Sequence, residues 1–375
     1  MRKILSVLLS LGLLACSRPP LAGEDSQEIK IGVFQSLTGP EATFGQDALH
    51  GIALAAEEIN AEGGLLGRKV KLIVEDNQSK PGETSTIVRE LITQKGVVAL
   101  LGEVASSRSL EAAPIAQANG VPMIADSTNP KVTEMGDCIF RICFTDDYQG
   151  KVIAEFVKSL GIEDVAILTD LSQAYSVGLA ESFSSYFTAQ GGRILKRQDY
   201  RRGDRDFSAQ LTAIQAVHPQ MVVLPAYYTE APLIIKQARQ LGLTVPFVGG
   251  DGWDSETMFE LGGAAVEGNY FVNHFSAENK TPRIQNFVQK FQQKYGTIPP
   301  STAALSYDSM KLLADAIRRA QSTDRAKIRQ ALTDTKNFPA ISGALTFDEH
   351  RNPKTSAVII RLHNNKFAYF KTIVL

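Results

Sequence analysis

The chain has 375 residues, of which 44% are hydrophobic and 21% charged, and its formal net charge is -1 at pH 7. This length exceeds that of one typical domain, so we expect two domains, each with its own core. A nucleic-acid-binding protein normally shows a basic excess, so the small net charge argues against that class and favours a small-molecule ligand.

The first 26 residues are predicted to be a targeting signal and a tether. Arg2 and Lys3 precede an apolar segment, residues 4–15, that is too short to span a bilayer. Leu13 to Cys16 resembles the lipobox of bacterial lipoproteins, which implies cleavage before Cys16 and lipidation of its thiol; a secretory signal with a chance cysteine is the alternative. Residues 1–15 are then a signal peptide and residues 16–26 a tether. We expect a membrane-anchored lipoprotein, periplasmic or at the cell surface.

Strand and helix patterns alternate along the first 130 residues. Short apolar runs predict strands, and apolar residues at helical spacing predict the helices between them. The predicted strands are 29–34, 70–75, 97–101 and 121–125, and the predicted helices are 48–59, 84–93 and 106–118. This order is typical of a parallel sheet covered by helices on both faces.

The same alternation starts again after a further strand at 139–142. Strands are predicted at 165–168, 194–200, 221–224, 245–248 and 266–272, and helices at 147–160, 177–189, 207–216 and 231–241. The last third contains predicted helices at 282–295, 302–320 and 326–332, then a hairpin of strands 357–362 and 367–373. A second α/β unit therefore follows the first.

Hydroxyl groups follow two neighbouring predicted strands. Ser106 and Ser107 come after the third strand, and Asp126, Ser127 and Thr128 come after the fourth. In an open parallel sheet ligands bind outside the carboxyl ends of the strands, where a helix N-terminus offers N–H groups to an anion. The pattern therefore suggests a pocket for a ligand carboxylate. Alternatively, Ser106 only caps its helix and Thr128 only begins a turn.

Motifs of catalysis and metal binding are missing from the sequence. It has no nucleophile elbow, phosphate loop, His-Glu-x-x-His or dinucleotide-binding glycine motif, so we do not expect an enzyme. The five histidines are scattered, and we expect neither a metal nor a cofactor. Cys138 and Cys143 are five positions apart on a strand-like run, which places their thiols on opposite faces and disfavours a disulfide.

Several short motifs occur together in one order along the chain. They are Ser36 to Pro40, Phe44-Gly45, Ile59 to Gly64, Asp76-Asn77, Ser127 to Pro130, Arg141, Phe207 and Gln237 to Arg239. In this combination the chain resembles the leucine/isoleucine/valine-binding family of periplasmic solute-binding proteins, from about Ile29 to the C-terminus. The resemblance implies the type I periplasmic binding protein fold, in which two α/β lobes, each a parallel sheet flanked by helices, are joined by three hinge crossovers.

The resemblance also implies lobe boundaries. The N-terminal lobe would comprise residues 27–145 and 273–346, and the C-terminal lobe residues 146–272 and 347–375. We expect the hinge crossovers near 141–146, 271–275 and 338–348.

First-lobe ligand contacts follow from the same resemblance. Ser106 matches a serine that binds the ligand carboxylate, and Thr128 matches a threonine that contacts both the carboxylate and the ammonium. The carbonyl of Asp126 or Ser127 would accept from the ammonium; the loop is one residue shorter than the usual pattern, so this choice stays open. Phe44 stands where the family has an aromatic pocket wall.

Second-lobe contacts are implied in the same way. Asp251 matches the acid that pairs with the ammonium, with Asp where relatives often carry Glu, and Tyr175 and Tyr227 match pocket aromatics. The alternatives are a turn role for Asp251 and interlobe packing for the tyrosines. Trp253, the only tryptophan, is expected in the pocket or at the cleft rim.

The resemblance implies a function in amino-acid import. An α-amino acid, branched-chain or otherwise apolar or aromatic, would be captured between closing lobes and delivered to an ABC permease and ATPase complex. Contact with the membrane would be through the N-terminal lipid only. The alternative is a ligand sensor of the same fold that signals to a membrane partner. Neighbouring permease and ATPase genes would favour import, and a neighbouring kinase or chemoreceptor gene would favour sensing.

Overall fold

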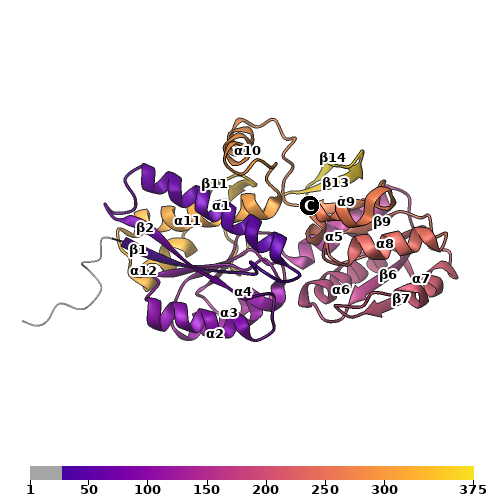
Figure 1. The fold of residues 1–375 in the computed structure, drawn as a ribbon, viewed down its shortest axis with the longest axis horizontal. Helices are drawn as coiled ribbons and strands as arrows, with labels where there is room; N and C mark the ends of the chain where they lie inside the picture. Colours follow the sequence, from indigo (N-terminus) through magenta and orange to yellow (C-terminus); the bar gives the residue numbers. More distant parts are fainter. Residues whose placement is uncertain (1–27) are drawn as a thin grey trace, which may run out of the picture.

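Two separate sheets organise the computed structural model, which describes residues 28–375 (Figure 1). The predicted signal peptide, the tether and Cys16 lie outside the described residues. Within residues 28–375, none of the helices combines the length and the apolar character that a membrane crossing requires.

The first sheet is parallel and has the strand order β2-β1-β3-β4-β5. Its strands are β1 (Glu28–Gln35), β2 (Lys69–Asp76), β3 (Ala99–Leu101), β4 (Met123–Ala125) and β5 (Ile139–Arg141). The connecting helices are α1 (Ala42–Ala61), α2 (Glu83–Glu90) with a π-helical turn (Leu91–Lys95), α3 (Ser106–Ala118) and the short α4 (Lys131–Glu134). Ile31 and Val33 of β1 face a core that includes α1, while Phe34 faces a core with α2 and α3, as the alternation of a strand requires.

The second sheet has the order β14-β13-β10-β9-β8-β6-β7. Strand β13 is antiparallel to both of its neighbours, β10 and β14. The strands are β6 (Asp164–Asp170), β7 (Arg193–Tyr200), β8 (Met221–Val223), β9 (Phe247–Gly249), β10 (Tyr270–Asn273), β13 (Ala357–His363) and β14 (Lys366–Ile373). The helices are α5 (Asp146–Ser159), α6 (Ala174–Ala189), α7 (Ser208–Gln215), α8 (Ala231–Gln240), α9 (Thr257–Gly262) and two 3-10 turns, η2 (Asp251–Trp253) and η3 (Gly263–Val266). We call this sheet with its helices the second lobe.

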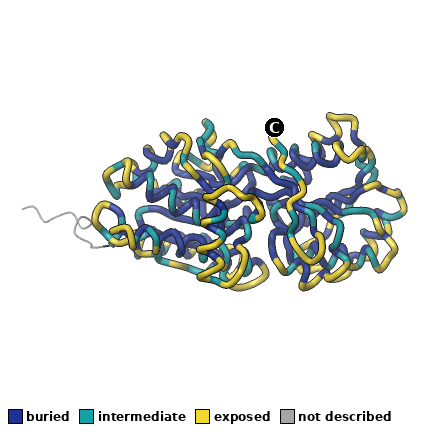
Figure 2. Tube along the Cα trace, turned by 90° about the horizontal axis from the view of Figure 1, so that it is seen from above, coloured by how far each residue is buried: buried dark blue, intermediate teal, exposed yellow. Residues whose placement is uncertain are grey.

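The chain returns to the first sheet after β10. The returning elements are α10 (Pro282–Tyr295), α11 (Ser301–Ala320), α12 (Arg325–Thr333) and the hairpin β11 (Phe338–Ala340) and β12 (Gly343–Leu345). Helix α11 packs directly against α1. The two backbones are so close at Gly51 that a Cβ there would lie 2.1 Å from the carbonyl oxygen of Ala303. We call the first sheet with its helices and these elements the first lobe. Buried backbone runs through both lobes, with exposed loops around it (Figure 2).

Within the described residues the chain crosses between the lobes three times: after β5, after β10 and before β13. The resemblance implied the first two crossovers near 141–146 and 271–275, and in the structure β5 ends at Arg141 and β10 ends at Asn273. The third lies further along the chain than 338–348 suggested, because β11 and β12 still pack on the first lobe. The buried Asp308 carboxylate of α11 holds this hairpin by accepting the Ile341 N–H at 2.9 Å, a contact that sequence periodicity does not reveal.

Both cysteines of the described residues are free and buried. Cys138 belongs to the core that contains α2 and α3, and Cys143 to the core on the opposite face of the first sheet. This arrangement confirms the expectation that the two thiols are on opposite faces.

Candidate functional site

A pocket with about 340 Å³ of free space, open solvent at its mouth included, lies between the two lobes. Loops that follow the strands of both sheets meet here, as expected for an α/β ligand site. The first lobe contributes Phe44, Val104, Asp126, Thr128, Ser301, Thr302 and Leu305. Tyr175, Tyr227, Asp251, Gly252 and, at the second crossover, His274 complete the lining. Six of the nine residues predicted from the sequence therefore line one pocket.

Aromatic rings form one wall of this pocket. Tyr175 at the start of α6 and Tyr227 after β8 are stacked, with ring centroids 5.1 Å apart and planes 15° from parallel. Phe44 of α1 meets Tyr227 edge-on across the lobes at 5.7 Å. Burial raises the pKa of both tyrosines well above the usual value, so their phenols stay neutral. The wall is therefore aromatic and uncharged.

Asp251 supplies a carboxylate at the end of β9. Its Oδ1 accepts a hydrogen bond from Gln149 Nε2 at 2.9 Å, and its Oδ2 lies 2.9 Å from His274 Nε2. Glycines flank it for a steric reason: a Cβ at Gly250 would be 1.9 Å from the Gln149 side-chain oxygen, and one at Gly252 would be 2.9 Å from the ring of Tyr227. The acid can face the pocket only because its neighbours have no side chains.

The side chain of Asp126 is hydrogen-bonded to α11 and is not free to bind a ligand. Its carboxylate accepts hydrogen bonds from Ser306 and, at 3.0 Å, from Ser309 of α11. Burial raises the pKa of this carboxyl to about 6, against the lowering effect of the two hydroxyls. Asp126 therefore holds its loop against α11, and it is also one of the residues that line the pocket.

Ser127 is not among the residues that line this pocket, and its carbonyl accepts a hydrogen bond from the Arg141 guanidinium. Arg141 also donates to the carbonyl of Asn129 at 2.7 Å. The sequence left two carbonyls open as acceptors for the ammonium, those of Asp126 and Ser127. The Ser127 carbonyl accepts from an arginine, and Asp126 is the one of the two residues that lines the pocket.

Ser106 and Ser107 lie beside the pocket lining. Ser106 is the first residue of α3 rather than its cap; Ala105 holds the cap position and makes no side-chain capping hydrogen bond. The Ser106 hydroxyl accepts the Asn129 N–H at 3.3 Å and so links the two polar loops. The Ser107 hydroxyl donates to Gln173 at 3.3 Å and accepts the Ala174 N–H at 3.1 Å, both in the second lobe.

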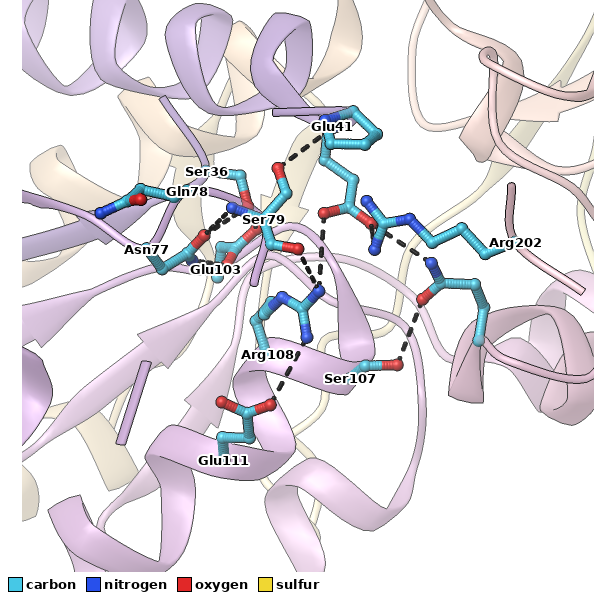
Figure 3. Close-up of polar contacts among 12 residues, drawn as sticks. Ser36, Glu41, Asn77, Gln78, Ser79, Glu103, Ser107, Arg108, Glu111 and Arg202 are labelled. Atoms are coloured by element: carbon cyan, nitrogen blue, oxygen red, sulfur yellow. Dashed lines mark hydrogen bonds and ion pairs between the residues drawn. The ribbon is translucent and has the colours of Figure 1, made fainter. Parts of the chain in front are cut away.

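A buried polar network continues from these loops into the first lobe (Figure 3). Glu103 accepts a hydrogen bond from Ser36 at 2.9 Å and another from Asn77. Burial raises the pKa of Glu103 to about 8. Arg108 of α3 donates to the carbonyl of Ser79 at 2.6 Å. This network ties the loop after β3 to the loop after β2.

Sequence reasoning missed His274 and Gln149 and misplaced Trp253. His274 directly follows β10, so its position at a strand end was a usable signal; Gln149 lies within α5, where a glutamine is unremarkable. Trp253 is fully buried in the second-lobe core and does not line the described pocket.

Two α/β lobes with a polar and aromatic pocket between them, joined by three crossovers, define a type I periplasmic solute-binding protein. The chain belongs to the periplasmic binding protein family, whose model matches residues 28–366.

Several relatives agree with this assignment over most of their length. A leucine-binding protein, LivK, from Thermotoga maritima has 40% identity and a TM-score of 0.89, over 92% of this chain and 99% of that one. The branched-chain amino acid transporter substrate-binding protein LivJ from Streptococcus pneumoniae, solved with isoleucine, has 32% identity and a TM-score of 0.87, over 93% and 99%. Leu/Ile/Val-binding protein homolog 3 of Brucella melitensis is 30% identical over 86% of this chain and 88% of its own length.

Proposed function

We propose that the protein captures a branched-chain or similarly apolar α-amino acid between its lobes and delivers it to an ABC importer. The observation that carries this proposal is the position of Asp251, which faces a first-lobe wall formed by Thr128 and Asp126 across a pocket lined by aromatic rings.

The polar parts of an α-amino acid suit this arrangement. Its carboxylate needs donors, and the uncapped N-terminus of α3 at Ser106, next to Thr128, offers N–H groups and a hydroxyl. Its ammonium needs acceptors, and Asp251 with the carbonyl of Asp126 supplies them. Small adjustments of the lobes around a bound ligand would bring Ser106 from beside the lining to the ligand, as hinge motion allows.

The remaining wall suits an apolar side chain. Tyr175, Tyr227, Phe44 and Leu305 present rings and an aliphatic side chain to the pocket, and burial of an aliphatic ligand side chain there would contribute roughly 1.5–3 kcal/mol. The leucine-binding and isoleucine-bound relatives support this size and polarity.

The role in import rests on the relatives and on the N-terminal sequence. Lipidation of Cys16 would hold the protein at the membrane beside a permease. A Cys16→Ser variant should lose incorporation of labelled palmitate and move from the membrane to the soluble fraction; an unchanged fractionation would refute the lipid anchor.

Ligand identity is tested with the full-length chain in a non-ionic detergent. The melting temperature, measured by intrinsic fluorescence, should rise by several degrees with saturating leucine, isoleucine or valine, because a ligand that binds only the folded state stabilises it. Leucinamide, which has no carboxylate, and 4-methyl-2-oxopentanoate, which has no ammonium, should produce smaller shifts. If no amino acid shifts the transition, the proposed ligand class is wrong. Loss of labelled-leucine uptake on gene deletion would support import, and unchanged uptake would contradict it.

A further inference from the structure

His274 connects the pocket acid to two of the hinge crossovers. It follows β10 at the second crossover, and its side chain is only 3% exposed. Its ring stacks on Phe144 of the first crossover, with centroids 3.7 Å apart. Its Nε2 lies 2.9 Å from Asp251 Oδ2. The imidazole therefore lies where ligand recognition and hinge geometry meet.

The charge of this imidazole decides what Asp251 can offer. A carboxylate oxygen is an acceptor, so Nε2 must carry the hydrogen in this contact. In the neutral imidazole the pair keeps a charge of about -1, which attracts an ammonium; in the imidazolium the pair is neutral, and an ammonium meets a second cation. The same hydrogen bond thus exists in two states that differ in their attraction for the ligand.

Acidic groups surround His274 on several elements. Nearby carboxyls are those of Asp126, Asp251 and Asp254. Burial raises the pKa of Asp126 and Asp254, and a positive charge on His274 lowers it. Behind Phe144 are Asp146, Cys143 and Arg141, where burial raises the pKa of the carboxyl and the thiol and so favours their neutral forms. The acid in direct contact with the imidazole is Asp251, whose Oδ2 lies 2.9 Å from Nε2.

We propose that His274 is a positioning and specificity-determining residue that holds Asp251 in place and, through its own charge, sets the preference for ligands that carry an ammonium group. This inference rests on the proposed function. Arrival of the ammonium next to Asp251 expels the proton from His274 to solvent, so that amino-acid binding is coupled to proton release. On acidification the positive charge of His274 offsets the negative charge of Asp251, so the carboxylate attracts a ligand ammonium less.

The test is calorimetric titration of the full-length protein with leucine in phosphate and in Bis-Tris, whose ionisation enthalpies differ. Between pH 5.5 and pH 7.5 binding should release protons, because the ligand ammonium and a charged imidazole repel each other beside Asp251. The dissociation constant should increase about tenfold from pH 7.5 to pH 5.5. Over the same range 4-methyl-2-oxopentanoate should compete progressively better, because protonated His274 already satisfies Asp251.

A variant separates His274 from the surrounding carboxyls. His274→Gln keeps an N–H donor for Asp251 but cannot take up a proton, so proton release should vanish and the affinity should change less than about twofold with pH. His363→Gln, which changes a half-exposed side chain on β13, should behave as wild type. Proton release retained in His274→Gln, or absent from the wild type while leucine binds, would overturn the inference.

Two further outcomes are distinguishable. If leucine and other amino acids do not bind the wild type at any pH, the proposed function fails and this inference fails with it. If His274→Gln does not fold, histidine resonances of the labelled wild type still decide the question. A titrating signal, assigned to His274, that becomes neutral on leucine binding would support the inference, and one that stays protonated would refute it.

Discussion

Glu41 at the start of α1 and Arg202 after β7 form an ion pair of 2.9 Å across the two lobes (Figure 3). The glutamate side chain is only 3% exposed and the arginine 20%. Gln173 donates to the same carboxylate at 3.3 Å, and Arg108 lies 3.9 Å from its other oxygen. A buried carboxylate is thus shared by cations of both lobes, an arrangement available only when the lobes are closed.

Removing the second-lobe cation should favour opening. Arg202→Ala leaves Glu41 with Arg108 and Gln173, so we expect a loss of about 1–2 kcal/mol in ligand affinity, mostly as faster dissociation. Stopped-flow release of the ligand and small-angle scattering without ligand measure the two effects. Arg201→Ala, which changes the exposed neighbouring arginine, is the matched control. Equal dissociation rates in both variants would show that the ion pair does not stabilise the closed form.

Asp251→Asn should weaken amino-acid binding by about 2–5 kcal/mol, the range for truncating one partner of a buried charge pair. The amide keeps one acceptor oxygen for Gln149 or His274 but removes the negative charge that the ammonium needs. Calorimetry with leucine measures the loss, and Asp204→Asn on the exposed surface of the same lobe serves as the control. Unchanged affinity would rule out Asp251 as the ammonium partner.

Ser106→Ala should weaken leucine binding by about 1–3 kcal/mol. The hydroxyl is expected to donate to the ligand carboxylate, so leucinamide binding should change much less than leucine binding. The folded state should tolerate the change, since no cap is lost: Ala105, not Ser106, holds the cap position of α3. If leucine and leucinamide lose affinity equally, Ser106 supports the loop instead of contacting the carboxylate.

Glu103 should make folding stability depend on pH. Burial raises its pKa from 4.5 to about 8, so between these values the folded protein binds a proton that the unfolded chain releases. The unfolding free energy should therefore fall as pH rises through this range, by about 1 kcal/mol per unit. Glu103→Gln should make the profile measured by urea unfolding from pH 5 to pH 8 less steep, while the exposed Glu134→Gln should not. A wild-type profile that rises with pH would contradict this prediction.

Local order in the sequence was sufficient for the two α/β units, whereas the three crossovers between lobes were implied only by the family resemblance. The alternation of short apolar runs with helical spacing predicted two parallel α/β units, and the period-two pattern near the C-terminus predicted the hairpin of β13 and β14. These signals are readable because each element buries a regular face of its own. Polar residues just after a strand, such as Thr128 and Asp251, were readable for a similar reason: strand ends of a parallel sheet share one edge.

The tertiary structure decided which of these polar groups meet and which are engaged elsewhere. The Asp126 carboxylate accepts a hydrogen bond from a hydroxyl of α11. Asp251 contacts Gln149 and also His274, which lies at the second crossover. The partners are separated by between 23 and 183 positions along the chain, so no local periodicity links them. Glu41 meets Arg202 only through the approach of two lobes. Sequence determines the local elements because their spacing is local, whereas the packing of distant elements determines which charges share a buried site.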